Sequence, residues 1–151
     1  MITSKEMKLI VELRKNGREN ITDLAKKHDF PKSTMYDLLH RMEKEGIIEH
    51  RSIVDFQKLG FPLQVFFVVK TTTQHKEKLK KYLTEKKNIN SIYTVNHGFN
   101  FHFMGVFRNQ KDVEDFLEEL ENDYPLTQIN VYTVIETIAT EKFLSEEEHF
   151  A

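Results

Sequence analysis

Polar and basic side chains gather on one face of the segment FPKSTMYDLLHRMEKEGII, residues 30–48. Its apolar residues recur at helical spacing, so a helix here would turn one face to a core and leave the other free. The free face, extended by one later arginine, holds Lys32, Ser33, Thr34, Tyr36, Asp37, His40, Arg41, Lys44 and Arg51. Hydroxyls and free N–H groups at a helix start bond phosphate oxygens, and Tyr, His and Arg further along can reach base edges. The pattern predicts a helix that binds DNA.

The same polar face also has an ordinary structural interpretation. Arg41 and Lys44 could pair with Asp37, Glu43 and Glu45 on a solvated helix surface. Exposed ion pairs of this kind are frequent and weak. The helix alone leaves both interpretations open, so the flanking elements must decide between them.

Those flanking elements predict a helix-turn-helix. Asn20 can cap a short helix, ITDLAKKH, and Pro31 interrupts it because proline lacks an N–H and restricts the preceding residue. Asp29 lies in the turn, where a left-handed residue is often needed. Ser33 is predicted to cap the following helix, and Gly46 to end it.

The segments on either side complete an N-terminal domain. Thr3 and Glu6 form a possible capping box for a first helix that Gly17 would end. After Ile48, the stretch HRSIVDFQKLGFP is expected to form a short strand or wing, followed by a turn near Gly60. We therefore assign residues 1–50 to a winged helix-turn-helix domain and 51–61 to a wing or hinge linker.

From Pro62 the period changes to a βαββαβ order, which is typical of a ferredoxin-like domain over residues 62–151. The strands are predicted in LQVFFVVKTT, SIYTVNHG, FNFHFMGVF and TQINVYTVIETIAT, the last being long. The helices are predicted in HKEKLKKYLTEKKN and, behind Asn109, in QKDVEDFLEELEN, with a tight turn at Gly98 between the middle strands. The predicted fold class is thus α+β.

Apolar residues occupy both faces of the predicted sheet. Phe101, Phe103 and Phe107 share one face of their strand, and Met104 and Val106 share the other. Two helices cover only one face, so a second copy of the chain is expected to cover the other; a partly exposed sheet is the simpler alternative. Phe103 is the first choice for the open face, although the pattern does not separate it from Met104.

Bulk properties narrow the class further. The 151-residue chain, 39% hydrophobic and 30% charged, suits one or two folded domains. It has no cysteine, its N-terminus carries Glu6 and Glu12, and its apolar run VFFVV is too short for a membrane, so a cytoplasmic protein is expected. Residues 1–60 hold 12 Lys/Arg against 10 Asp/Glu and residues 61–151 hold 10 against 14, a modest asymmetry.

The segment LAKKHDFPKSTMYDLLHRMEKEGIIEHRSIVDFQKLGF resembles the winged DNA-binding domain of the Lrp/AsnC (feast/famine) transcription regulators. The match is carried by Leu24-Ala25, Ser33-Thr34, the run from Arg41 to Ile48, and Lys58-Leu59-Gly60. The βαββαβ remainder resembles that family's effector-binding domain. The resemblance implies a transcriptional regulator that binds two-fold DNA operators as a homodimer, or as an octamer of stacked dimers, and responds to amino acids.

The resemblance also implies an effector site at the turn formed by Asn96, His97, Gly98 and Asn100. The family usually has a Gly-x-Tyr-Asp-like turn, whereas this chain has Gly98-Phe99-Asn100-Phe101. Asn100 replaces a carboxylate that could pair with an ammonium group, and a neutral amide binds that charge much less well. We therefore expect an altered or absent effector and weak binding of ordinary amino acids.

The alternative function is a siroheme-decarboxylase-like or heme-binding protein on the same fold. His97-Gly98-Phe99-Asn100 and nearby His102 resemble an HxYN-like turn of such enzymes, but their preceding His and Tyr/Arg residues are not evident in NINSIYTVN. No phosphate loop, nucleophile elbow, paired-carboxylate motif or metal-ligand spacing is present. We therefore predict no enzyme activity, no cofactor and no metal.

Overall fold

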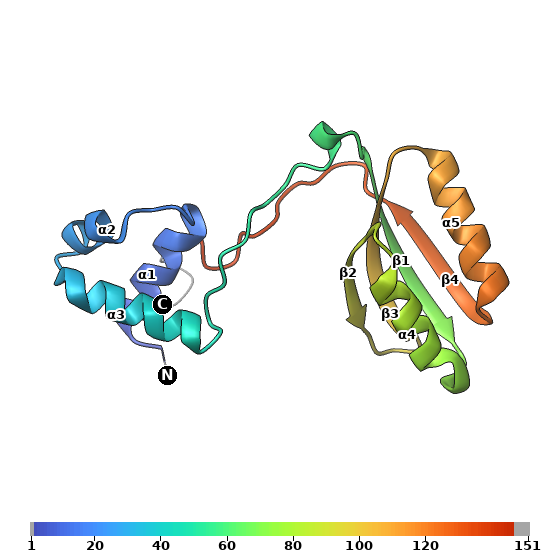
Figure 1. The fold of residues 1–151 in the computed structure, drawn as a ribbon, viewed down its shortest axis with the longest axis horizontal. Coiled ribbons are helices and arrows are strands. Elements are labelled where there is room, and N and C mark those ends of the chain that lie inside the picture. The colour runs from blue at the N-terminus through green and yellow to red at the C-terminus, as the bar shows by residue number, and fades with distance from the viewer. Residues whose placement is uncertain (1, 147–151) are drawn as a thin grey trace. The chain divides into compact units, whose positions relative to one another are not determined.

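The computed structural model describes residues 2–146. The chain folds into two compact units (Figure 1). The helical unit comprises the residues up to Ile53 and a C-terminal segment that begins at Ile138. The sheet unit comprises Val54–Thr137. Residues from Ile138 onward, expected to continue the ferredoxin-like domain, are therefore grouped with the helices instead.

The helical unit contains α1 (Ser4–Lys15), α2 (Ile21–Lys27) and α3 (Lys32–Lys44). Thr3 and Glu6 form the predicted capping box, and the side chain of Asn20 accepts a hydrogen bond from the Thr22 N–H, as predicted. The three helices bury a shared core of Leu9, Ile10, Ile21, Leu24, Ala25, Met35 and Met42. Burial of these side chains is the main force that holds such short helices together.

Two predicted helix boundaries in this unit are wrong. Ser33 does not cap α3, because the helix starts at Lys32, two residues before the start that a Ser33 cap predicts, with Pro31 in the N-cap position and no side-chain capping bond. The Pro31 carbonyl oxygen accepts the Met35 N–H, so the first turn of the helix already includes Ser33. Helix α1 ends at Lys15 with Asn16 as its C-cap, before Gly17, whereas Gly46 follows the end of α3 with a φ of 71° as predicted.

The expected wing strand is also absent from the described chain. Residues 48–55 are not in a strand, and the turn before the sheet is made by η1 (Gln57–Leu59) and by Gly60 at a φ of 86°. A β-prone sequence becomes a strand only when a neighbour supplies the hydrogen-bonding ladder. Ile53, whose type predicts burial in a strand, is 82% exposed.

The sheet unit confirms the ferredoxin-like prediction. Its strands are β1 (Leu63–Thr71), β2 (Ile89–Thr94), β3 (Phe101–Phe107) and β4 (Leu126–Thr133). They form one antiparallel sheet in the order β2-β3-β1-β4. Helices α4 (Lys76–Glu85, preceded by η2, Thr73–His75) and α5 (Gln110–Asp123, capped by Asn109) cover one face (Figure 1).

Phenylalanine rings fill the layer between the sheet and its helices. Phe67 of β1 stacks on Phe103 of β3 with ring centroids 4.9 Å apart, and Phe116 of α5 meets Phe67 edge-on at 5.3 Å. The alternation of β3 would place another large side chain at position 105, but the residue is glycine. A Cβ at Gly105 would lie 2.6 Å from the Phe107 ring, so the glycine leaves room for that ring.

Within the sheet unit, Val54–Thr137, both α4 and α5 lie on one face of the sheet and neither covers the opposite face (Figure 1). Because Phe103 is fully buried under the helices, its assignment to the open face is wrong, and Met104, one residue along, lies there instead. Paired positions place Phe66, Tyr93, His102 and Tyr132 on the same side as Met104. Strand β4 is shorter than predicted, since Ile135 and Ile138 lie beyond it and are 94% and 91% exposed.

Among residues 2–146, no helix combines the length and the apolar character needed to cross a bilayer.

Substitution of Gly105 by alanine tests the packing of the phenylalanine layer. The new methyl group would collide with the Phe107 ring, so we expect the sheet unit to lose about 1–3 kcal/mol of unfolding free energy, measured by denaturant titration. Gly17→Ala is the matched control, because its Cβ would meet only the Leu13 carbonyl oxygen at 3.8 Å. Equal stability of Gly105→Ala and wild type would contradict this packing.

Candidate nucleic-acid interface

The turn between α2 and α3 is tight and is held by backbone hydrogen bonds. The Phe30 N–H donates to the Ala25 carbonyl oxygen at 2.8 Å, and Asp29 adopts the predicted left-handed conformation with a φ of 55°. Ala25 is almost completely buried where the two helices meet. This geometry is a helix-turn-helix, as the sequence predicted.

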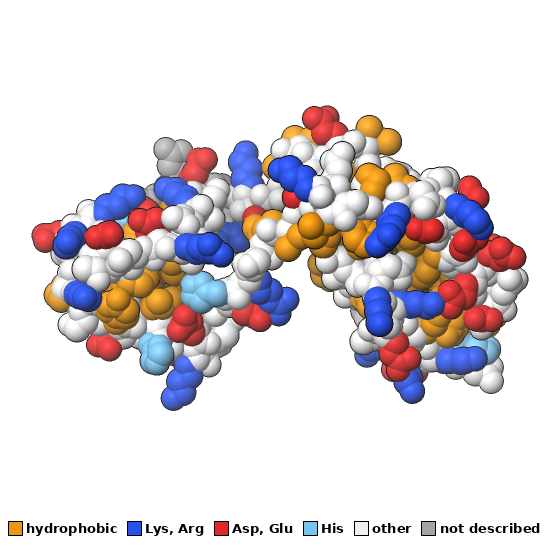
Figure 2. All heavy atoms as spheres, turned by 45° about the horizontal axis from the view of Figure 1, so that its top comes forward, with side chains coloured by type: hydrophobic (Ala, Val, Ile, Leu, Met, Phe, Trp, Pro, Cys, Tyr) orange, Lys and Arg blue, Asp and Glu red, His pale blue; other side chains and the backbone are white. Residues whose placement is uncertain are grey.

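Helix α3 buries one side and exposes the other. Met35 and Met42 are fully buried against α1 and α2. The exposed residues among those predicted for this surface are Lys32, Ser33, Tyr36, Asp37, His40, Arg41, Lys44 and Arg51, and only Thr34 is half-buried. Lys and Arg side chains are interspersed with acidic ones on the face seen in Figure 2. The polar side of α3 is thus open, but its surroundings are not uniformly basic.

The N-terminus of α3 lies at one end of this exposed side. Because Pro31 makes no side-chain capping bond, the first-turn N–H groups of Lys32, Ser33 and Thr34 are not capped by it. The first intrahelical bond is donated by the Met35 N–H to the Pro31 carbonyl oxygen, at 3.3 Å. The Lys32 ammonium lies 5.8 Å from the centre of the Tyr36 ring. The Lys32 ammonium, the Ser33 hydroxyl and the uncapped N–H groups of the first turn therefore lie together at the positive end of α3.

Arg41 has a partner that the sequence pattern did not predict. Its guanidinium forms a hydrogen-bonded ion pair with the carboxylate of Glu6 on α1, although 49% of the Arg41 side chain remains exposed. The same Glu6 carboxylate accepts a hydrogen bond from the Thr3 N–H at 2.5 Å. Hydrogen bonds with the backbone and the side chain of Thr3, together with the Arg41 charge, hold the pKa of Glu6 below its ordinary value. Arg41 therefore ties α3 to the start of α1.

None of the ion pairs predicted for the solvated-helix interpretation is formed within residues 2–146. Glu43 pairs with His40 at 3.5 Å and with His50 at 3.0 Å, not with Arg41. Arg51 pairs with Glu49 at 2.7 Å. No carboxylate within residues 2–146 lies within 4.0 Å of the Lys44 ammonium, which leaves that charge facing solvent.

A second acidic residue of α1 holds α2 in place. The Glu12 side chain is 9% exposed; it accepts a hydrogen bond from the Lys27 ammonium at 2.8 Å, and the His28 Nε2 atom lies 3.3 Å from its other oxygen. The Lys27 bond holds the pKa of Glu12 below its ordinary value, although partial burial opposes the shift. These contacts fix the end of α2 just before the turn into α3.

The predicted effector turn lies between β2 and β3. Asn96, His97 and Gly98 are exposed, and His97 and Gly98 have φ values of 55° and 90°. Asn100 is half-buried, and its side-chain oxygen accepts from the Thr71 N–H at 2.6 Å while its own N–H donates to the Val69 carbonyl oxygen at 2.9 Å. The amide at this position therefore joins the turn to the end of β1.

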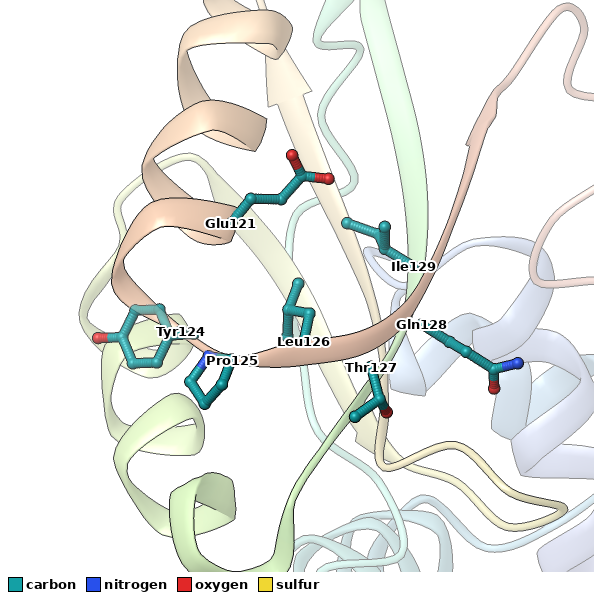
Figure 3. Close-up of a pocket in the computed structure, with 7 residues that line it drawn as sticks. All are labelled: Glu121, Tyr124, Pro125, Leu126, Thr127, Gln128 and Ile129. Carbon is teal, nitrogen blue, oxygen red and sulfur yellow. The ribbon is translucent and has the colours of Figure 1, made fainter.

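Two surface hollows lie elsewhere. One of about 340 Å³ is lined by Glu121 and Tyr124 at the end of α5 and by Pro125–Ile129 along β4 (Figure 3). The other, about 830 Å³, lies in the helical unit beside the end of α1, where Ile10, Ile47 and Ile53 line it. None of the four predicted effector residues lines either hollow.

The two histidines of the heme-like alternative lie in different parts of the sheet unit. His97 lies in the exposed turn, whereas His102 lies on the open sheet face with its ring 5.2 Å from that of Phe66. In the described part of the chain, no three His, Asp or Glu side chains are grouped as a metal site would require.

The chain is similar to known regulators in sequence. An uncharacterized HTH-type transcriptional regulator of Pyrococcus abyssi is 28% identical over 120 residues, which cover 77% of both chains. Another from the same organism is 19% identical over 139 residues, 91% of this chain and 95% of the relative. No family model matches the chain.

The chain is also similar to solved structures. E. coli AsnC superposes with a TM-score of 0.83 at 15% identity, over 93% of this chain and 96% of that one. B. subtilis LrpC gives 0.82 at 21% identity, over 93% and 99%. A Neisseria meningitidis transcriptional regulator, solved as an L-Met complex, gives 0.84 at 14% identity, over 93% and 94%.

The chain thus combines a helix-turn-helix unit with a ferredoxin-like sheet, and it is similar over most of its length to HTH-type transcriptional regulators. Its fold is that of E. coli AsnC and B. subtilis LrpC, which agrees with the Lrp/AsnC resemblance of its sequence.

Acidification tests the two carboxylates of α1. Because the pKa values of Glu6 and Glu12 are lower in the folded chain than in the unfolded one, their stabilisation is fully present above about pH 5 and is lost as the pH falls through the lowered pKa values. We expect the melting temperature of the helical unit, followed by circular dichroism, to fall between pH 5 and pH 3. In Glu12→Gln the fall should be smaller; an identical fall in the variant would contradict the role of Glu12.

Proposed function

We propose that the helical unit binds double-stranded DNA with α3 in a major groove, and that two copies of the chain bind together on a two-fold site. The observation that carries this proposal is the exposed polar side of α3, which its own unit leaves uncovered while it buries the opposite side. A recognition helix of a helix-turn-helix presents its N-terminal residues to base edges in this way.

The exposed side of α3 would make two kinds of contact with DNA. Phosphate oxygens would be bound by the Ser33 hydroxyl, the first-turn N–H groups, Lys32 and Lys44, with Arg51 further along the backbone. Base edges would be met by Tyr36, Asp37 and His40, which project from the middle of the helix. Thr34, half-buried, would contribute chiefly its backbone N–H.

The role that we propose for Arg41 differs from the base contact that its type and position predicted. Its guanidinium offers five donors in a planar fork, and Glu6 occupies one side of it. The exposed half of the side chain can still approach DNA, but its orientation is set by Glu6. Arg41 would thus hold α3 at a fixed angle to α1 while it faces the groove.

The open face of the sheet would bind a second copy of the chain. Phe66, Tyr93 and His102 form a row of rings on it, with His102 5.2 Å from Phe66 and 6.0 Å from Tyr93. Paired positions add the apolar Val68, Met104, Val106 and Tyr132 and the uncharged polar Gln64, Ser91, Gln128 and Asn130. The permanent charge among these strand positions is Lys70, near the end of β1. A face of this composition, without a carboxylate among these strand positions, suits burial against its own copy.

Modulation by a small amino-acid-like molecule at the β2–β3 turn is part of the same proposal. The similar regulator of Neisseria meningitidis was solved with L-Met. In this chain the turn would offer Asn96, His97 and the Gly98 backbone, whereas the Asn100 oxygen already accepts a bond from the chain itself. A ligand ammonium group would therefore find no free carboxylate among these four residues, which favours weak binding of ordinary amino acids.

Selection of DNA from random sequence tests the proposal directly, and we expect a two-fold site to be enriched. Lys44→Ala should weaken binding to all sequences alike and reduce the slope of log affinity against log salt by about 1, because it removes one phosphate contact. Lys111→Ala, an exposed lysine on α5, is the matched control. Failure of the wild-type protein to enrich any sequence at low salt would refute DNA binding.

A charge on the open sheet face tests the dimer. Met104→Asp should convert the dimer to a monomer in sedimentation experiments, because a carboxylate would be buried without a partner. Gln74→Asp places the same charge at an exposed position of η2 and should leave the dimer intact. A wild-type protein that sediments as a monomer, or a Met104→Asp variant that stays dimeric, would count against association through this face.

A further inference from the structure

The segment 138–146 returns from the sheet unit to the helices, and we refer to it as the C-terminal clasp. Its contacts are made with the last turn of α1 and with the core of the helical unit. Arg14 Nε donates to the Phe143 carbonyl oxygen at 3.1 Å, and Arg14 Nη1 donates to the Glu141 carboxylate at 2.5 Å. Leu144 packs, partly buried, against the cluster that contains Leu9 and Ile10.

The backbone of the clasp is held in a shape that an unattached segment would rarely adopt. Glu141 and Leu144 have φ values of 54° and 62°, a conformation that side chains other than glycine disfavour. A turn supports this shape, because the Ser145 hydroxyl donates to the Lys142 carbonyl oxygen at 2.8 Å. Unfavourable backbone angles persist where surrounding contacts determine them. Arg14 and the apolar core supply those contacts here.

The clasp changes how the two units are connected. The chain leaves the helical unit after Ile53 and re-enters it at Ile138, so two polypeptide segments join the helices to the sheet. A body attached by one flexible segment explores many orientations, and a second attachment removes a large share of them. The second attachment exists only while Arg14 and Leu144 hold the clasp in place.

We propose that the C-terminal clasp sets the half-site spacing that the dimer accepts, an inference that rests on the proposed two-fold DNA binding. Two recognition helices engage successive major grooves when they lie about 34 Å apart on one side of the duplex. With both attachments intact, the helical units hold that separation and discriminate against other spacings. With the clasp released, each unit moves on a single segment, so the dimer loses affinity for the best spacing and tolerates poor ones.

The test uses the full-length dimer and three duplexes made from the selected site. The first has the selected spacing, the second has its half-sites moved apart by about 5 base pairs, or half a helical turn, and the third has a single half-site. The measured quantity is the ratio of affinities for the first two duplexes. We expect Arg14→Ala and Leu144→Ser to lower that ratio on the order of tenfold and to bind the single half-site like wild type.

Lys142→Ala is the matched control, since the Lys142 backbone forms the turn while its side chain is exposed. It should keep the wild-type ratio. Hydrogen exchange measured on the same proteins should show the last turn of α1 less protected in Arg14→Ala and Leu144→Ser than in Lys142→Ala. Leu144→Ser alters the core of the helical unit, whereas Arg14→Ala alters a side chain at its surface. Agreement between the two variants therefore shows that release of the clasp, and not unfolding of the helical unit, causes the effect.

Two outcomes would overturn the inference while the proposed function stands. One is an unchanged affinity ratio in variants whose exchange shows the clasp released. The other is unchanged protection of α1 in both variants, which would mean that the clasp does not hold the helix. Failure of the wild-type protein to bind the duplex with the selected spacing would instead refute the proposed function, and the spacing role with it.

Discussion

Helix α1 is the element on which the arrangement of the helical unit depends, because three of its charged side chains each hold a different segment. Glu6 binds Arg41 of α3, Glu12 binds Lys27 at the end of α2, and Arg14 binds the C-terminal clasp. The apolar residues between them bury the core that the three helices share. Burial supplies most of the stabilisation, and the ion pairs select one mutual orientation of the segments. Because α1 is joined to each of these segments, α3 keeps one orientation within the helical unit, and its polar side faces solvent.

Much of the fold follows from local rules that are visible in the sequence. The change of period after Pro62 predicted the strand β1 correctly, and the capping residues Thr3, Asn20 and Asn109 marked helix starts correctly. Gly46 and Asp29 adopted the left-handed angles that their positions predicted. These features depend on a residue and its near neighbours, so a single sequence contains the information. Ser33 is not the cap, because the helix starts at Lys32 with Pro31, two residues before Ser33, in the N-cap position.

The features that could not be predicted depend on pairs that are distant in sequence. The Arg41–Glu6 pair joins residues 35 positions apart, and the Arg14–Glu141 pair joins residues 127 apart. The choice between Phe103 and Met104 for the open face required knowledge of which side the helices cover. The residues on α3 were predictable as an exposed set, but the constraint on Arg41 was not. Asn100 was identified as a departure from a family pattern, whereas its bond to Thr71 became visible only in three dimensions.

The return of the chain to the helices makes the sheet unit an insertion within the helical unit rather than a domain appended to it. During synthesis on a ribosome, α1 emerges before the sheet unit, whereas Glu141 and Leu144 emerge after it. The sheet unit, whose strands all lie before residue 134, can therefore finish folding while α1 still lacks a partner for Arg14. The contacts of Arg14 with the C-terminal clasp therefore form only after the last strand of the sheet unit has been made.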